Sequence, residues 1–391
     1  MKKFLSIILS LALMLLLCTT SLAAGEKEVG ALIYPEDNLN ATKISAASAI
    51  LIEAKTGTVL YSKNQENRQS PASVTKIMTL LLACEAIENE KIRLDDKVCI
   101  SSYAASMGGS QVFLEEGEEL TVEELLKCTV IASANDAAVA LAELISGTEG
   151  NFVAEMNKRA GELGMKNSKF ENATGLDDTT KEHFSSAEDI AIMSRELLKY
   201  DVITKYSSLW QDSIRDGEFI LTNTNRLVRF YEGCNGLKTG STNKAGFCVS
   251  ATAKRGNMQL IAVIMGAPTR DERNNDARAL LDYGFSTYAI YEKTSKDIEE
   301  VRVKKGVLDR VMAYCEDFSV VVKRSDVKKI EEHYEIPESI SASVKKDDKI
   351  GSISFLLDGK LLGSADILAR ESVEKISFFA VFIKMLRNIV K

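Results

Sequence analysis

The stretch over residues 70–83 constrains the fold most, because a short polar opening turns into a long apolar run. Its sequence is SPASVTKIMTLLLA, with one proline and no glycine. A run with so few breakers predicts a loop that continues into a buried helix. Pro71 stands where the chain would begin the first turn, a position that proline favours. The fold is therefore expected to enclose this helix in its core.

Ser73 and Lys76 are three positions apart and would share one face of that helix. A serine hydroxyl is a weak nucleophile at neutral pH and needs a neighbouring base. A lysine can act as that base only if burial or a second cation keeps part of it neutral. A helix-capping serine followed by a solvated lysine explains the pair equally well. The functional interpretation therefore depends on motifs elsewhere in the chain.

The composition sets broad limits. With 391 residues, of which 45% are apolar, the chain is long enough for two domains, or one large and one small. Its net charge of −7 gives no reason to expect a nucleic acid partner. Because it has only two histidines, His183 and His333, and no C-x-x-C pair, we expect no metal and no cofactor. Cys84 and Cys128 lie in apolar helical patterns and are expected to be small core residues.

The first 23 residues have the pattern of a secretory signal peptide, with cleavage expected after Ala23. Two lysines precede an apolar run over 4–17, and small residues follow it. The run is short for a membrane-spanning helix, which makes a retained anchor the weaker alternative. A lipoprotein attached through Cys18 is also weaker, because Leu17 is bulky where a small residue is needed. The protein is therefore expected to be exported.

Residues 40–288 are expected to form the main domain. A hairpin over 46–61 opens it, and Thr121 begins a helix with a capping-box pattern. Two strands, 247–253 and 259–266, and a helix over about 273–283 close it. Strands at both ends with helices between them predict an α+β domain, in which helices cover an antiparallel sheet. The further helices expected between the strands cover about 137–145, 152–163 and 186–200.

Residues 292–370 contain short β-type runs and are expected to form a separate, small β-rich domain. Asp358 and Gly359 predict a tight hairpin turn within it.

Residues 373–391 have the pattern of an amphipathic helix. Lys384, Arg387 and Lys391 fall on one narrow arc, and a wide apolar, aromatic sector fills the rest. A basic polar face with such a sector favours a helix that lies in a membrane surface. Packing on the β-rich domain or a dimer contact are the alternatives.

Three short motifs follow one another along the chain: Ser73-x-x-Lys76, Ser133-Ala134-Asn135 and Lys238-Thr239-Gly240. The first opens a helix, the second lies at a turn between two helices, and the third leads into a strand beside the sheet edge. Each motif is common by itself. The full set in this order is specific and is a known catalytic signature.

On these motifs the chain resembles the low-molecular-mass penicillin-binding proteins that are serine D-alanyl-D-alanine carboxypeptidases. The likeness in motifs extends over about 40–285 and includes residues 173–177 and 266–273. It implies a DD-peptidase/β-lactamase-like fold, followed by a small β domain and a C-terminal amphipathic anchor. It also implies a peripheral location on the outer face of the bacterial cytoplasmic membrane.

The resemblance further implies a mechanism. Ser73 would attack the carbonyl between the two terminal D-alanines of a peptidoglycan stem peptide and form an acyl-enzyme, and Lys76 would take its proton. Ser133 would relay a proton to the leaving amine, and Asn135 would hold the substrate amide. Lys238 would bind substrate and disfavour protonation of Lys76. β-Lactam antibiotics would acylate the same serine.

The remaining implied roles concern the substrate. Thr239 and Arg273 would hold its terminal carboxylate, and Gly240 belongs to the same binding motif. The backbone N–H groups of Ser73 and Ser241 would form the oxyanion hole.

Four alternatives stay open at this point. A class A β-lactamase would need a deacylating glutamate, and none stands in an E-x-x-L-N setting between residues 146 and 186. A transpeptidase would differ only in the acceptor of the acyl group. A non-enzymatic wall scaffold would leave the intact motifs unexplained. A Ser–His–Asp triad would require His183, the only histidine of the main domain.

Overall fold

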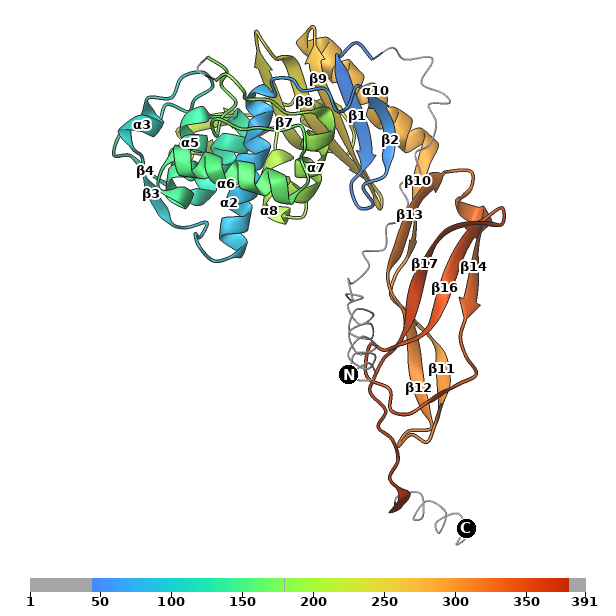
Figure 1. Cartoon of the computed structure of the whole chain (residues 1–391). Coiled ribbons are helices and arrows are strands. Elements are labelled where there is room, and N and C mark those ends of the chain that lie inside the picture. Colours follow the sequence, from blue (N-terminus) through green and yellow to red (C-terminus); the bar gives the residue numbers. More distant parts are fainter. Residues whose placement is uncertain (1–43, 179, 380–391) are drawn as a thin grey trace, which may run out of the picture. The chain divides into compact units, whose positions relative to one another are not determined.

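The computed structural model describes residues 44–178 and 180–379 (Figure 1). The expected signal peptide, 1–23, and residues 380–391 of the expected C-terminal helix lie outside this part. Within it, no helix combines the length and the apolar character that crossing a bilayer requires.

A five-stranded antiparallel sheet forms the centre of the main domain, as predicted. Its strand order is β2-β1-β9-β8-β7, so that the first and last strands along the chain, β1 and β9, pair with each other, and β2 and β7 form the two edges. These strands are β1 (Ser48–Glu53), β2 (Val59–Lys63), β7 (Cys234–Thr242), β8 (Gly246–Arg255) and β9 (Met258–Ala267).

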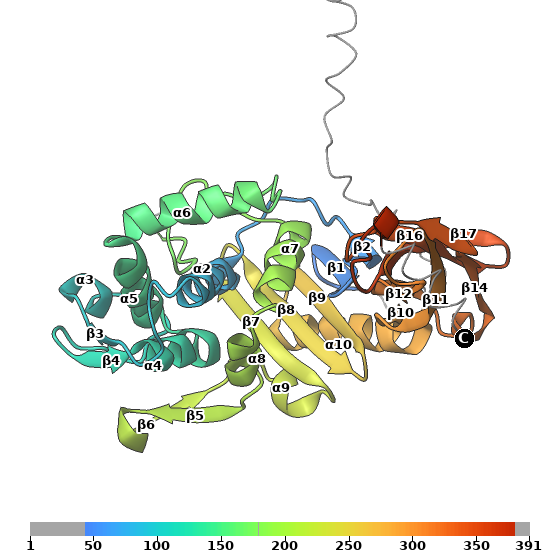
Figure 2. The ribbon, with the colours of Figure 1, turned by 90° about the horizontal axis from the view of Figure 1, so that it is seen from below.

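Helices cover both faces of this sheet (Figure 2). Side chains alternate between the two faces of a strand. On β1, Ile50 packs into the core that holds α2, α5 and α7, whereas Leu51 packs into the core beneath α10. The helices are α2 (Lys76–Glu88), α3 (Ser102–Ala105), α4 (Val122–Lys127), α5 (Asn135–Ser146), α6 (Glu149–Glu162), α7 (Ala187–Leu197), α8 (Asp201–Ser207), α9 (Leu227–Phe230) and α10 (Arg270–Thr287).

The predicted buried helix is α2, and a 3₁₀ turn over Ala72–Thr75 precedes it. Almost the whole of α2 is buried, including its first residue, Lys76. A helix that is apolar all round belongs in a core, which is why the sequence pattern identified it. Cys84 and Cys128 are buried as expected, and the six cysteines of the described part are free thiols.

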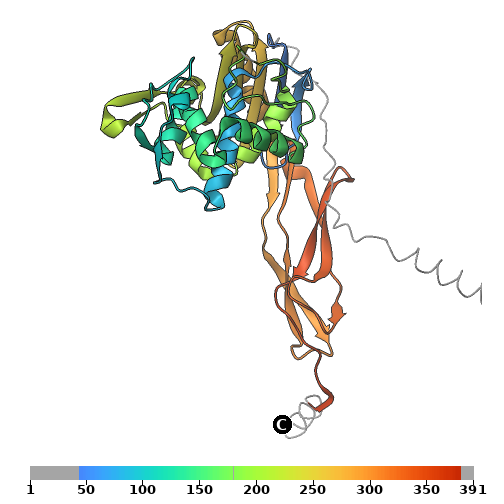
Figure 3. The ribbon, with the colours of Figure 1, turned by 60° about the vertical axis from the view of Figure 1, so that its left-hand side comes forward.

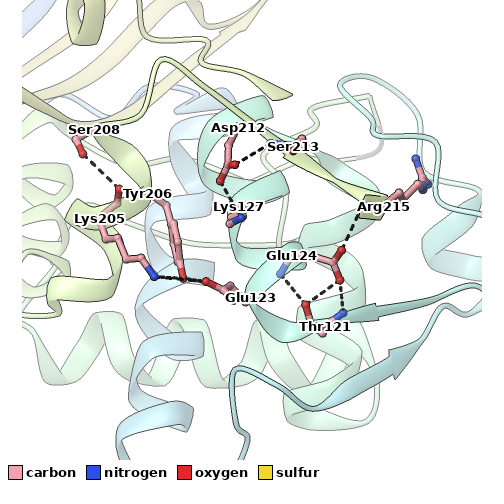
Figure 4. A network of polar contacts seen from close by, with 10 residues as sticks. All are labelled: Thr121, Glu123, Glu124, Lys127, Lys205, Tyr206, Ser208, Asp212, Ser213 and Arg215. Atoms are coloured by element: carbon pink, nitrogen blue, oxygen red, sulfur yellow. Dashed lines mark hydrogen bonds and ion pairs between the residues drawn. The ribbon is translucent and has the colours of Figure 1, made fainter. Parts of the chain in front are cut away.

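A small hairpin, β5 (Gln211–Ile214) and β6 (Phe219–Thr222), was not foreseen from the sequence. Polar contacts join it to α4 (Figure 4). Lys127 Nζ lies 2.8 Å from Asp212 Oδ2, and the backbone N–H of Arg215 donates to Glu124. Glu124 also closes the predicted capping box with Thr121. A further two-stranded ladder pairs β3 (Lys97–Cys99) with β4 (Glu119–Thr121).

The C-terminal part is β-rich, as predicted, and Figure 3 shows its long strands in orange and red. A six-stranded sheet has the order β14-β16-β17-β12-β11-β15, and β10 pairs with β13. Asp358 and Gly359 form the predicted turn, both with positive φ. The strands are β10 (Tyr288–Lys293), β11 (Asp297–Lys304), β12 (Arg310–Cys315), β13 (Phe318–Lys323), β14 (Ile330–Glu335), β15 (Ser339–Ser341), β16 (Lys349–Leu357) and β17 (Lys360–Ala369).

The expected start of the C-terminal helix at residue 373 is wrong. Val373 is completely buried, and its N–H and C=O both bond to Val344 at 2.8 and 3.0 Å. Lys375 forms a second β-bridge, with Gly306. Extended backbone therefore continues through this segment, because pairing with the β-rich part satisfies its polar groups. Helical conformation begins at Phe378, and Phe378 and Phe379 are the last two described residues.

Candidate active site

Ser73 and Lys76 share one face, as the spacing predicted. Ser73 lies in the 3₁₀ turn before α2, and Lys76 is the first residue of that helix. Lys76 Nζ is 3.1 Å from Ser73 Oγ. Ser73 is half-buried and lines a cavity, whereas Lys76 is completely buried behind it. The arrangement presents the hydroxyl to a ligand and conceals the amine.

Three oxygen atoms surround the Lys76 amine. Besides Ser73 Oγ, it contacts Asn135 Oδ1 at 2.5 Å and the backbone carbonyl of Thr174 at 2.8 Å. Burial lowers the pKa of Lys76 well below its usual value; the charge of Lys238 lowers it further, and Asp136 opposes the shift. In the neutral form the two N–H bonds point to the amide and carbonyl oxygens. The lone pair then faces Ser73.

The second motif lies where a π-helical turn over Cys128–Ala132 meets α5. Ser133 has φ +65° there and lines the cavity. A left-handed residue ends the first helix and redirects the chain into the next. Asn135 begins α5, and its Nδ2 donates to the carbonyl of Gly108 at 2.7 Å. This bond orients the amide so that the oxygen, not the nitrogen, faces Lys76.

The third motif lies within β7, an edge strand of the sheet, whereas the sequence predicted that it leads into a strand. β7 runs alongside the Ser73 turn at very short range. A Cβ atom on Gly240 would be 2.8 Å from both Ser73 N and Pro71 O. Only glycine allows this approach. Ser241, the next residue, is exposed and lines the cavity.

Two buried cations lie beside the nucleophile. Burial, and then the charge of Arg273, lower the pKa of Lys238 to about 7. Burial, and then the charge of Arg270, lower the pKa of Arg273 to about 10. Arg273 is held by its neighbour, because its Nη2 donates to Asn274 Oδ1 at 2.9 Å. Thr239 Oγ1 donates to Thr224 Oγ1 at 2.8 Å.

Part of the predicted site lines one cavity of about 190 Å³, whereas Lys76, Asn135 and Lys238 are buried and do not line it. Its lining is made of hydroxyl groups, a glycine and two arginines, with no carboxylate, and so favours an anionic ligand. The lining residues are Ser73, Ser110, Ser133, Thr224, Thr239, Gly240, Ser241, Arg270 and Arg273. Among the described residues no cluster of three or more His, Cys, Asp or Glu could hold a metal ion.

A larger cavity, of about 520 Å³, lies near the β8–β9 turn and includes Lys55, Arg195 and Lys254. It contains no serine, threonine or cysteine that could act as a nucleophile. We therefore place the candidate site at the smaller cavity, where Ser73 has an adjacent amine.

His183 does not serve Ser73. Its Nε2 lies 2.8 Å from Thr75 Oγ1, and its Nδ1 accepts the backbone N–H of Glu171 at 3.1 Å. Both ring nitrogens are therefore engaged by other groups. The Ser–His–Asp alternative has no support in this geometry.

Sequence reasoning missed several residues of the site. Ser110 and Thr224 line the cavity but stand in no recognised motif, and Arg270 lies within the matching stretch 266–273 but was not singled out. Thr174 contributes its backbone carbonyl, which any residue type could supply. Asp136 follows Asn135 directly, and a buried acid at a helix start is a signal that could have been used.

Asp136 fixes the segment that contains Val112 and Leu114. Its Oδ2 accepts the backbone N–H groups of Val112 and Leu114, each at 3.1 Å, and Oδ1 accepts that of Ala137 at 2.9 Å. The side chain is buried, and a carboxylate can accept hydrogen bonds but not donate them, which suits its three backbone N–H partners.

We expect Asp136→Asn to lower the free energy of unfolding by about 2–3 kcal/mol, because the new amide nitrogen would face backbone donors. Urea denaturation of both proteins measures the difference. Asp95→Asn is the matched control, since that side chain is 87% exposed. A loss no greater than that of the control would contradict this account of Asp136.

Comparison with known proteins identifies the family of the chain. The family profile described as D-alanyl-D-alanine carboxypeptidase matches residues 36–269, and the profile of the penicillin-binding protein 5 C-terminal domain matches 285–375. The D-alanyl-D-alanine carboxypeptidase DacF of Bacillus subtilis is 47% identical over 340 residues, which are 85% of this chain and 87% of DacF. The chain therefore belongs to the D-alanyl-D-alanine carboxypeptidase family.

Solved structures give the same result for the fold. Penicillin-binding protein 5 from Haemophilus influenzae is 32% identical with a TM-score of 0.73, over 85% of this chain and 98% of that one. Penicillin-binding protein D2 from Listeria monocytogenes, in an ampicillin-bound form, is 30% identical with a TM-score of 0.58. The match covers 62% of this chain and 99% of that one. The resemblance stated from the motifs, the α+β fold and the serine carboxypeptidase class are thereby confirmed, and the β-lactamase alternative is disfavoured.

Proposed function

We propose that this protein removes the terminal D-alanine from peptidoglycan stem peptides through an acyl-enzyme on Ser73. One observation carries the proposal: the Lys76 amine is buried against Ser73 Oγ while two fixed oxygens take its N–H bonds. An amine held in this way offers its lone pair to a single hydroxyl. A general base in contact with the nucleophile is what activation of a serine requires.

Acylation begins with proton transfer from Ser73 Oγ to Lys76 Nζ. The oxygen attacks the carbonyl carbon of the D-Ala–D-Ala bond, and negative charge develops on the carbonyl oxygen. The backbone N–H groups of Ser73 and Ser241 are the donors for this oxyanion. Gly240 supports this role, because it lets β7 approach the Ser73 turn closely.

The leaving group then departs. Ser133, on the cavity wall, relays a proton to the nitrogen of the terminal D-alanine, the C–N bond breaks, and an ester on Ser73 remains. Thr239 and Arg273 hold the carboxylate of that D-alanine, and Asn135 and Lys238 orient the rest of the chain. The cavity is lined by two arginines and no carboxylate, which supports binding of the substrate with its terminal carboxylate in this cavity.

Water completes the cycle by attacking the ester carbonyl while Lys76 accepts its proton; the bond between the acyl carbon and Ser73 Oγ then breaks, and Lys76 returns the proton to Ser73 Oγ. A transpeptidase would use an amine at this step, and the family assignment favours hydrolysis. A β-lactam enters the first half of the same reaction and leaves Ser73 acylated.

Mass spectrometry after incubation with labelled penicillin tests the proposal. We expect one adduct, on the peptide that contains Ser73, and no D-alanine release from a D-Ala-D-Ala peptide by Ser73→Ala. Ser208→Ala, at an exposed position, is the control and should behave as the parent protein. An adduct on a different residue, or full D-alanine release by Ser73→Ala, would refute the mechanism.

For the location, we propose export through residues 1–23 and peripheral attachment to the outer face of the cytoplasmic membrane through the C-terminal segment. The basic arc and aromatic sector of that segment support attachment. The helix would begin near Phe378, whose exposed fraction is 89%, and not at 373. Flotation with anionic lipid vesicles should recover the full chain but not a chain that ends at residue 377. Equal recovery would refute the anchor.

A further inference from the structure

His183 is a buried titratable side chain that the mechanism above does not use. It is 4% exposed and packs edge-on against Phe170. The backbone N–H of Glu171 can only donate, so Nδ1 of the ring accepts at 3.1 Å. We therefore assign the proton to Nε2, which donates to Thr75 Oγ1 at 2.8 Å. The neutral ring fills both roles at once.

The two partners of His183 belong to different parts of the site. Thr75 ends the turn that holds Ser73 and directly precedes Lys76. Glu171 begins the segment that contains Thr174, whose carbonyl receives an N–H of Lys76 at 2.8 Å. The ring thus joins the segment that bears the nucleophile to the segment that orients the base.

Other contacts show how closely these segments fit. Thr79 Oγ1, one turn along α2, donates to the carbonyl of Ala173 at 2.6 Å. A Cβ atom on Gly175 would lie 1.8 Å from the carbonyl oxygen of Ala72. The Thr174 carbonyl therefore has little freedom as long as its segment stays attached to the turn.

We propose that His183 is a positioning residue for acylation: it holds the Thr174 carbonyl where that oxygen directs the Lys76 lone pair at Ser73. The inference rests on the proposed function. Hydrogen bonds run from Ser73 through Lys76 to Thr174, and from Glu171 through His183 back to Thr75. Without the ring, one connection between turn and segment is lost. A displacement of a reacting group by about 1 Å costs about 100-fold in rate.

The electrostatic surroundings agree with a neutral ring. Burial lowers the pKa of His183 to about 4, although Glu171 and Asp177 oppose the shift; Lys244 adds to it. At neutral pH the ring therefore carries one proton and keeps one acceptor nitrogen. A doubly protonated ring would present a donor to the Glu171 N–H and lose that bond.

The test separates positioning from binding. Stopped-flow acylation with a fluorescent penicillin gives the rate constant at saturation and the affinity of the preceding complex. We expect His183→Leu to lower the rate constant about tenfold or more and to leave the affinity within about twofold, because Arg273 and Thr239 are untouched. His183→Gln, whose amide has both a donor and an acceptor, should restore most of the rate. His333→Leu, at an exposed histidine, is the matched control.

Thr75→Val keeps the shape of the side chain and removes the acceptor. We expect the same loss of rate as in His183→Leu, and no additional loss in the double variant, because both changes break one connection. If His183→Leu does not fold, as judged by circular dichroism, the acylation rate of Thr75→Val alone tests the inference. Unchanged rates in the folded variants, or a double variant whose loss equals the product of the single losses, would overturn the inference. Absence of a Ser73 adduct in the parent protein would instead refute the proposed function.

Discussion

Lys76→Met is expected to lower the acylation rate about 1000-fold or more without lowering the melting temperature. Among the described residues, Lys76 is the only one that forms a hydrogen bond with Ser73 Oγ, so its loss removes the proton acceptor. Methionine has nearly the same length and carries no charge. Because Lys76 is completely buried, methionine relieves the folded protein of a polar amine held away from water, and this gain offsets the donor lost by Asn135 Oδ1 and the Thr174 carbonyl. Penicillin labelling and thermal unfolding measure the two effects.

Lys76→Arg distinguishes a base from a mere positive charge. A guanidinium stays protonated throughout the working range of pH and cannot accept the Ser73 proton. We expect this variant to be as inactive as the methionine variant. Lys91→Met, at an exposed position after α2, serves as the control and should retain full activity. Acylation by Lys76→Met within about tenfold of the parent rate would show that another group takes the proton.

Gly240→Ala is expected to reduce acylation about 100- to 1000-fold, the loss typical when an oxyanion donor is removed. The added methyl group would lie 2.8 Å from Ser73 N, which is one of the two proposed donors, and 2.8 Å from Pro71 O. Both are backbone atoms and cannot move aside as a flexible side chain would. Either β7 or the Ser73 turn must shift, and the two donors then separate. Labelling with penicillin at saturating concentration measures the loss.

Gly161→Ala is the matched control for that substitution. A Cβ atom at Gly161, inside α6, would meet no heavy atom within 4 Å. Alanine is favoured over glycine in a helix by about 1 kcal/mol, so this variant should be slightly more stable and fully active. If Gly240→Ala acylates as fast as Gly161→Ala, the close approach of β7 has no part in catalysis.

Much of the fold was predictable because its signals are local. The helix after Ser73 is apolar on all sides, the capping box at Thr121 needs only four residues, and the Asp358–Gly359 turn needs two. The β5–β6 hairpin was missed, because its strands are short and its position depends on contacts with α4. The extended start of the C-terminal segment was missed for a related reason: burial against Val344 outweighs the amphipathic pattern.

The sequence by itself determined which chemical groups are available and in what order: a serine, a lysine one helical turn later, and two further motifs. Tertiary structure alone decided that the Lys76 amine meets Asn135 and Thr174, which are 59 and 98 positions away along the chain. It also decided the lowered pKa of Lys76, since burial and the charge of Lys238 depend on how two cores pack around the sheet. Spacing sets contacts within one helix, whereas distances between distant segments follow from the packing of the whole domain.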